Sequence, residues 1–285
     1  MLLAAVLTLR PRARITLSAS LGWAIHAWFL SQVRARNPAL SEQLHAPNAP
    51  RPFTLSPLLG TGRPIRGEIT LEPGQEYRLR ITSLEAGFSR FLHDELLPAL
   101  PGSEARLYQA HLEITGATCD AKVHPWAGTS TYEQLSRTYL MEMDRPPRRS
   151  MTLHFASPTT FRRSSAASDE EGGRGRIVHN VPLPLPDLVF GSYLRRWNNF
   201  APVELPVEAQ RYAEACLAIS RYRLQTVLIE FGRMREVGFV GKCSFTALHF
   251  DAYWLRVMNL LAAFAFYAGT GRHTVLGLGQ TRWLA

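Results

Sequence analysis

The chain has 285 residues, of which 46% are hydrophobic and 19% charged, so it can bury a sizeable core and is too apolar for an intrinsically disordered protein. Its formal net charge of +9 favours an anionic partner and disfavours an acidic one. Only Lys122 and Lys242 are lysines. Because the planar guanidinium of arginine binds phosphate through paired hydrogen bonds, the excess of arginine favours nucleic acid, although a codon bias would explain the same excess.

The cysteines and the apolar segments narrow the class of protein further. Cys119, Cys216 and Cys243 are far apart and form no CxxC pair, so the sequence predicts neither a disulfide framework nor a zinc site. The nine apolar residues at the start precede basic residues, which is the reverse order of a secretory signal. The apolar stretch over residues 255–268 is shorter than the ~20 residues of a membrane-spanning helix. We therefore expect a cytoplasmic protein without metal, other cofactor or membrane partner.

The first half of the chain predicts the element order βαββαβ. Alternation at Leu7 and Leu9 predicts a strand, and apolar spacing over residues 21–33 predicts a helix. Alternating runs over residues 69–71 and 77–81 flank Pro73-Gly74 and predict a hairpin. A helix over residues 89–97 and a strand over residues 108–114 complete the order of a ferredoxin-like, RRM-like fold.

The second half repeats this order. A strand over residues 152–155 leads into a polar stretch through Arg176 that is typical of a loop, and helices are predicted over residues 188–198 and 207–217. A strand over residues 237–245, a helix over residues 253–264 and a last strand over residues 275–282 follow. The fold class is therefore α+β, with two tandem ferredoxin-like domains, residues 1–125 and 126–285, and a glycine-rich loop near the C-terminus.

The glycine-rich loop joins the last predicted helix to the last predicted strand and contains Gly269, Gly271, Gly277 and Gly279. Glycine permits positive φ and close backbone approach, so the loop can present N–H groups to phosphate oxygens, assisted by Arg272. Tight packing of the loop against its own sheet explains the same spacing equally well. The loop is no Rossmann fingerprint, because it follows a helix and precedes a strand.

Besides this loop, four further segments are distinctive: Asn37-Pro38-Ala39-Leu40 with Leu44-His45, Pro52-Phe53-Thr54-Leu55-Ser56-Pro57-Leu58, Ser157-Pro158-Thr159-Thr160-Phe161 and Trp197-Asn198-Asn199-Phe200. Together they resemble the CRISPR-associated endoribonuclease family that processes pre-crRNA, the Cas6 family of the RAMP superfamily. The resemblance spans nearly the whole chain. It implies metal-independent cleavage of CRISPR repeat RNA by its own 2′-hydroxyl, which leaves a 2′,3′-cyclic phosphate and a 5′-hydroxyl.

The resemblance also implies catalytic positions. Such a reaction needs a base, an acid and a cation for the phosphorane, and histidine suits the first two because its pKa lies near neutrality. In family members that use a Tyr-His-Lys set, the histidine corresponds to His45, the lysine to Arg51 and the tyrosine to Leu30. Leucine cannot transfer a proton, so we take His26, one helical turn before Leu30, as a further candidate. The alternatives are a packed helix residue for His26 and a solvated loop residue for Arg51.

Basic residues in or beside predicted loops are candidates for binding the RNA backbone. They are Arg145, Arg148, Arg149, Arg162, Arg163, Arg174 and Arg176, together with Arg272 and His273 of the glycine-rich loop. His273 and His249 are lesser catalytic candidates. Merely solvated loops would explain the same arginine clusters.

Three functions remain open. The first is an endoribonuclease that cuts CRISPR repeat RNA, as a monomer or homodimer, and that could contact subunits of a CRISPR effector complex. The second is a non-catalytic RAMP-type subunit that holds crRNA in such a complex, and the departure at Leu30 favours it. The third is a generic basic α+β protein of a DNA or membrane surface, which would make the glycine-rich loop and the Leu44-His45 segment coincidental.

Overall fold

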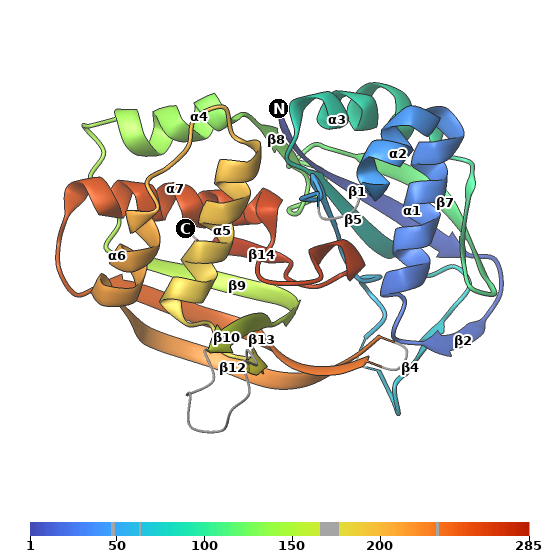
Figure 1. Cartoon of the computed structure of the whole chain (residues 1–285). Coiled ribbons are helices and arrows are strands. Elements are labelled where there is room, and N and C mark those ends of the chain that lie inside the picture. The colour runs from blue at the N-terminus through green and yellow to red at the C-terminus, as the bar shows by residue number, and fades with distance from the viewer. Residues whose placement is uncertain (47–48, 63, 166–176, 232–233, 285) are drawn as a thin grey trace.

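The computed structural model describes residues 1–46, 49–62, 64–165, 177–231 and 234–284. Two halves lie side by side, each with a sheet that helices cover on one face (Figure 1). Arg174 and Arg176 lie outside the described residues.

The first half has a main sheet in the order β3-β5-β1-β7-β6, to which β8 (Gly128–Ser130) adds by pairing with β1. Taking β1, β3, β5 and β7 as the four strands of a βαββαβ unit, the order is 2-3-1-4, that of the split βαβ fold. The elements are β1 (Leu2–Pro11), β2 (Ile15–Ser18), α1 (Gly22–Arg36), α2 (Pro38–His45), β3 (Phe53–Leu55), β4 (Glu68–Leu71), β5 (Tyr77–Ser83), α3 (Ala86–Phe91), η1 (Leu92–Leu96), η2 (Leu97–Ala99), β6 (Glu104–Leu107) and β7 (Ala110–Thr118).

The second half has a sheet in the order β12-β13-β9-β14, again 2-3-1-4 when counted over its own four strands. On the viewer's side of Figure 1, α5 and α6 cover this sheet, and α7 lies along it. The elements are α4 (Tyr132–Ser136), η3 (Arg137–Met141), β9 (Ser150–Thr159), β10 (Phe161–Ser165), β11 (Ile177–Val181), α5 (Pro186–Phe200), α6 (Glu208–Cys216), β12 (Leu217–Phe231), β13 (Met234–Ala247), α7 (Ala252–Ala268), η5 (Thr274–Leu276) and β14 (Thr281–Leu284).

The first strand is apolar on both faces because it serves two cores. Leu3 and Leu7 pack into the core of the first half, whereas Leu2 and Ala4 belong to the core of the second half. An inter-half contact on β5 reinforces this arrangement. Arg80 is 1% exposed, and its guanidinium donates hydrogen bonds to Gln280 Oε1 at 2.6 Å and to the Phe266 carbonyl at 2.6 Å.

The predicted α+β class with two tandem ferredoxin-like units is confirmed, but the predicted hairpin and the start of the last predicted strand are wrong, and one long strand was missed. Residues 69–71 and 77–81 form no hairpin, because β4 pairs with β2 in a separate two-stranded sheet while β5 lies between β3 and β1. The strand β12 was not predicted at all. The last strand begins only at Thr281, since residues 274–276 form the 3₁₀ turn η5.

Among the described residues, no helix is long and apolar enough to cross a membrane. In the same part of the chain, no group of three or more His, Cys, Asp or Glu side chains could hold a metal ion. The three cysteines are free, and Cys243 is buried.

Candidate active site and nucleic-acid interface

Three predicted catalytic residues meet where α1, α2 and the approach to β3 come together. His26 lies on α1, His45 is the last residue of α2, and Arg51 lies just before β3. The charges of Arg51 and His45 both act on the His26 ring, so the three side chains share one environment. The packing of α2 against α1 thus brings together residues that are up to 25 positions apart in the sequence.

The Asn37-Pro38 pair begins the helix that carries His45. The Asn37 side chain accepts a hydrogen bond from the Leu40 N–H at 2.9 Å, and Pro38 occupies the first turn, where a missing N–H costs nothing. At the other end, His45 Nδ1 lies 2.7 Å from the Ser41 carbonyl oxygen. A carbonyl can only accept, so Nδ1 of the exposed ring carries the proton, and in the neutral ring Nε2 is then an acceptor.

The environment of His26 favours its neutral form. The ring is half-buried and stacks on Phe53 of β3, with centroids 6.1 Å apart. Burial lowers the pKa of His26 from its ordinary 6.5, and the charges of Arg51 and His45 lower it further. At neutral pH the imidazole can therefore accept a proton.

Arg51 and Leu30 complete this corner of the molecule. The Arg51 guanidinium donates to the Ala46 carbonyl at 3.0 Å, which ties it to the end of α2, and its side chain is half-exposed. Leu30 is 8% exposed and packs into the core of the first half. The position that corresponds to a tyrosine therefore contributes packing here.

Several backbone N–H groups of the glycine-rich loop donate hydrogen bonds to carbonyls of the protein itself. Thr270 N–H donates to the Gly279 carbonyl, and Gly279 N–H donates to the Pro158 carbonyl. A Cβ on Gly279, at φ +72°, would lie 2.0 Å from the Thr270 carbonyl oxygen, so only glycine fits. At these positions the loop packs against its own fold, which is the alternative that its spacing left open, and these N–H groups are not available to phosphate.

The same loop also connects the two halves near the candidate catalytic corner. Its turn η5 contacts both α1 and β3. A Cβ on Gly22, the first residue of α1, would lie 2.3 Å from the Leu276 carbonyl oxygen, so the loop and the helix touch through their backbones. The position of α1, and with it His26, therefore depends on the loop.

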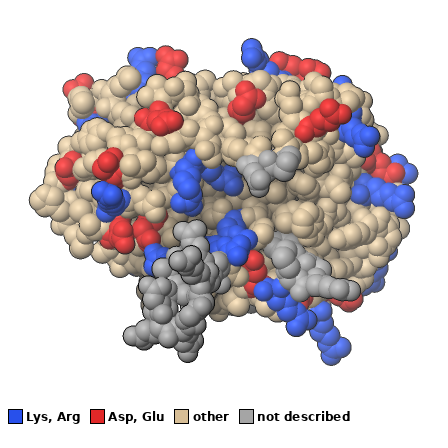
Figure 2. All heavy atoms as spheres, in the orientation of Figure 1, with Lys and Arg blue, Asp and Glu red and all other residues tan. Residues whose placement is uncertain are grey.

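Charged side chains of the loop face β13. Arg272 donates to Glu236 Oε1 at 3.2 Å, and His273 Nε2 lies 3.5 Å from the same oxygen. Arg196 of α5 donates to the hydroxyl of Thr274. Figure 2 shows Lys and Arg side chains near a hollow between the two halves, at the centre of the side of the molecule that faces the viewer.

The other predicted RNA-binding arginines lie in two places. Arg162 and Arg163 lie on β10, and Arg163 forms an ion pair with Asp187 of α5. Arg145, Arg148 and Arg149 lie in the exposed segment between η3 and β9. The sequence predicted both clusters in or beside loops, which holds for Arg145, Arg148 and Arg149, whereas Arg162 and Arg163 lie on a strand.

A further basic row crosses the outer face of the second sheet and was missed in the sequence. Arg223 lies opposite Lys242, Lys242 opposite His154, and His154 opposite Arg282, in register across all four strands. Trp126 adds an aromatic face, with its ring 4.8 Å from the Arg282 guanidinium. Like charges opposite one another on a sheet are destabilising, so this row is suited to a polyanion. Only the strand register brings these residues into one row, and sequence spacing does not reveal that register.

His154 and Arg282 also have unpartnered polar atoms. Nδ1 of His154 and Nε of Arg282 are buried and make no hydrogen bond to any described residue. Burial lowers the pKa of His154, and the charges of Arg282 and Lys242 lower it further. The outer face of the sheet is therefore a second candidate surface for nucleic acid.

Two family models match the chain. Residues 153–281 match the model described as CRISPR-associated endoribonuclease Cas6, and residues 1–137 match the CRISPR Cas6 N-terminal domain. No curated protein matches the sequence.

Solved structures resemble the chain over its full length. A product complex of Thermus thermophilus Cas6 (TTHB231) has 25% identity and a TM-score of 0.78, with 100% of both chains covered. A product complex of a second Cas6 (TTHA0078) has 28% identity and a TM-score of 0.73, with 100% of this chain and 99% of that chain covered. The product of a Cas6-related gene from Pyrococcus furiosus, at 11% identity and a TM-score of 0.64, covers 100% of this chain and 99% of its own and shares the fold.

Proposed function

The chain belongs to the Cas6 family of CRISPR-associated endoribonucleases, and on that premise we propose that it cleaves CRISPR repeat RNA without a metal ion. The relatives in the two product complexes support RNA as the partner. The observation that carries the proposal is the meeting of His26, His45 and Arg51 at one corner of the first half. Two imidazoles and one guanidinium can supply the base, the acid and the cation that cleavage by the RNA's own 2′-hydroxyl needs.

The geometry suggests a role for each group. His26, held neutral by its surroundings, accepts the proton of the attacking 2′-hydroxyl. His45, when protonated, keeps Nδ1–H on the Ser41 carbonyl and donates Nε2–H to the leaving 5′-oxygen. Arg51 stabilises the extra negative charge of the phosphorane. The bond from phosphorus to the 5′-oxygen breaks as the bond to the 2′-oxygen forms, so the products are a 2′,3′-cyclic phosphate and a 5′-hydroxyl.

RNA bound at His26, His45 and Arg51 would extend over the basic surfaces of the second half. Arg272, His273 and Arg163 lie on or beside the glycine-rich loop and β10, and the basic row of β12, β13, β9 and β14 lies on the outer sheet face. Each arginine that contacts a phosphate makes binding more dependent on salt.

The direct test is incubation of a repeat transcript with the protein in EDTA, read on a denaturing gel. We expect cleavage at one position, with a 3′ fragment that polynucleotide kinase labels without phosphatase treatment because its 5′ end is a hydroxyl. A matched transcript with 2′-deoxyribose at the scissile nucleotide should stay whole. Intact ribose RNA that nevertheless binds the protein would favour the non-cutting RAMP-type subunit, for which the buried Leu30 is the specific observation. Cleavage of the deoxy transcript, or cleavage that stops in EDTA, would contradict the mechanism.

The lowered pKa of His26 sets the pH dependence. Protonation of the base removes activity, and because the pKa of His26 lies below 6.5, the single-turnover rate should decline with falling pH only below pH 6.5. In His26→Gln the residual rate should lack this acidic limb. An acidic limb at or above pH 6.5 in the native protein, or an unchanged limb in the variant, would rule out His26 as the base.

A further inference from the structure

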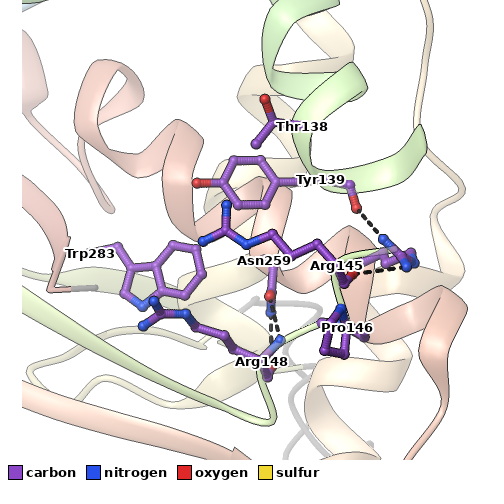
Figure 3. A pocket seen from close by; sticks show the side chains of 9 residues that line it. Thr138, Tyr139, Arg145, Pro146, Arg148, Asn259 and Trp283 are labelled. Atoms are coloured by element: carbon purple, nitrogen blue, oxygen red, sulfur yellow. Dashed lines mark hydrogen bonds between the residues drawn. The ribbon is translucent and has the colours of Figure 1, made fainter. Parts of the chain in front are cut away.

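A small cavity in the second half lies away from the catalytic corner. It has a volume of about 40 Å³ and lies between η3, the segment that follows it, α7 and β14 (Figure 3). Aromatic and arginine side chains, Tyr139, Trp283, Arg145 and Arg148, form much of its wall, and no Asp or Glu side chain lines it. None of these elements contributes to the junction of α1, α2 and β3.

Two buried polar residues of α7 fix the wall of this cavity. Arg256 is 8% exposed and donates to the carbonyls of Glu142 at 3.0 Å, Met143 at 3.1 Å and Arg145 at 3.1 Å. Asn259 is 3% exposed, accepts from the Arg148 N–H at 2.8 Å and donates to the Arg148 carbonyl at 3.0 Å. The backbone that carries Arg145 and Arg148 is therefore held in place before any ligand arrives, which lowers the entropic cost of binding.

The side chains on this fixed backbone gather around one indole ring. The Arg148 guanidinium lies 5.6 Å from the centroid of the Trp283 ring, and the Tyr139 ring lies 6.0 Å from it at 43°. Figure 3 shows the Arg145 and Arg148 side chains both running toward Trp283. Within the part of the chain that the structure describes, neither arginine forms an ion pair, so two positive charges stand beside two aromatic rings without an acidic partner.

We propose that this cavity binds one unpaired nucleotide of the RNA, with its base stacked on Trp283 and Tyr139 and its phosphate held by Arg145 and Arg148. The identity of the ligand as RNA rests on the proposed function. A volume of about 40 Å³ admits phosphate oxygens, whereas the base occupies the indole face that Arg148 covers in the free protein. The exchange is favourable, since a base stacked on an aromatic ring gains more than an exposed cation–π contact loses.

Photocrosslinking tests where the base lies. Repeat RNA with 5-iodouridine at its unpaired positions is irradiated with the full-length protein, and the linked peptide is identified by mass spectrometry. We expect a crosslink to Trp283 or Tyr139. Crosslinks at other aromatic residues and none at these two would overturn the assignment.

Affinity measurements test the contribution of the pocket. Trp283→Ala should weaken binding of the same RNA about tenfold, whereas Trp283→Phe should retain most of the affinity because it keeps a stacking face. Arg145→Gln with Arg148→Gln should make log Kd less dependent on log salt, by about two in slope.

The matched control is Tyr222→Ala, which removes an aromatic side chain that is 70% exposed on β12, and it should bind as the native protein does. Trp283→Ala that binds as tightly as Trp283→Phe would refute the pocket while leaving the proposed function intact. A native protein that neither binds nor cuts the repeat would refute the proposed function itself. If thermal melting shows that Trp283→Ala does not fold, the proposal is tested by the crosslink in the native protein and by the salt dependence of Kd in the variant with Arg145→Gln and Arg148→Gln.

Discussion

Replacing His45 with alanine is expected to slow repeat cleavage by at least ~100-fold while RNA affinity stays close to that of the native protein. The imidazole stands at the exposed end of α2 with Nδ1–H on the Ser41 carbonyl, so its loss removes a proton donor without disturbing the core. Binding depends mainly on arginine contacts to phosphate, which the variant retains. Single-turnover rates at saturating protein, together with filter binding, separate the two effects.

His93→Ala is the matched control for this experiment. His93 is also exposed at the surface of the first half and lies 2.7 Å from Asp94, but it is on η1, away from α2. Its removal should leave the cleavage rate within a factor of about two, as is usual for surface substitutions. A native rate in His45→Ala would remove His45 from the mechanism, whereas equal losses of rate in both variants would point to a general effect of surface histidines.

Hydrophobic spacing was sufficient to predict the elements that have one buried face. The helix predicted over residues 21–33 begins one residue before α1 and otherwise lies in it, the helix predicted over residues 188–198 lies within α5, and the strand predicted over residues 237–245 lies within β13. The long strand β12 has no such signal. Tyr222 is 70% exposed and Leu228 is 62% exposed, because the β12–β13 ribbon extends beyond the helices, and without one buried face the residues do not alternate.

The wrong hairpin has a different cause. Two alternating runs around Pro73-Gly74 are typical of paired strands, and the turn itself is real, since Gly74 has φ +82°. The chain nevertheless separates after the turn: Ile69 and Leu71 pair with β2, whereas β5 enters the main sheet between β3 and β1. Local pattern cannot specify which distant strand offers the better partner.

The sequence was sufficient to propose the residues of the candidate site, but not their arrangement in space. His45 and Arg51 followed from the family resemblance and His26 from helical spacing, yet their meeting depends on how α2 packs on α1. The glycine-rich loop was recognised, but its N–H groups bond to Pro158 and Thr160, which only the tertiary structure reveals. Trp283 and Tyr139 are 144 positions apart, so no sequence pattern connects them.

Arg80→Met is expected to cause the largest loss of stability, about 3–5 kcal/mol, because it removes a buried guanidinium and leaves its hydrogen-bond acceptors unsatisfied. The guanidinium donates to the Trp126 carbonyl at 2.8 Å, the Phe266 carbonyl at 2.6 Å and Gln280 Oε1 at 2.6 Å. Methionine is similar in length but donates nothing, so three buried acceptors would lose their partner. In a chain of this size such a change should lower Tm by on the order of 10 °C in scanning calorimetry.

Loss of Arg80 should also weaken a connection between the two halves. Gln280 donates to the Leu55 carbonyl at 3.0 Å, so the network joins β5 and β3 of the first half to the end of the glycine-rich loop. Arg78→Met is the matched control, since Arg78 lies two residues away on β5 and makes a partly exposed ion pair with Glu76, and such surface pairs contribute little to stability. Arg80→Met should therefore shift Tm several times further than Arg78→Met. Equal shifts would mean that the buried guanidinium contributes no more to stability than a surface ion pair does.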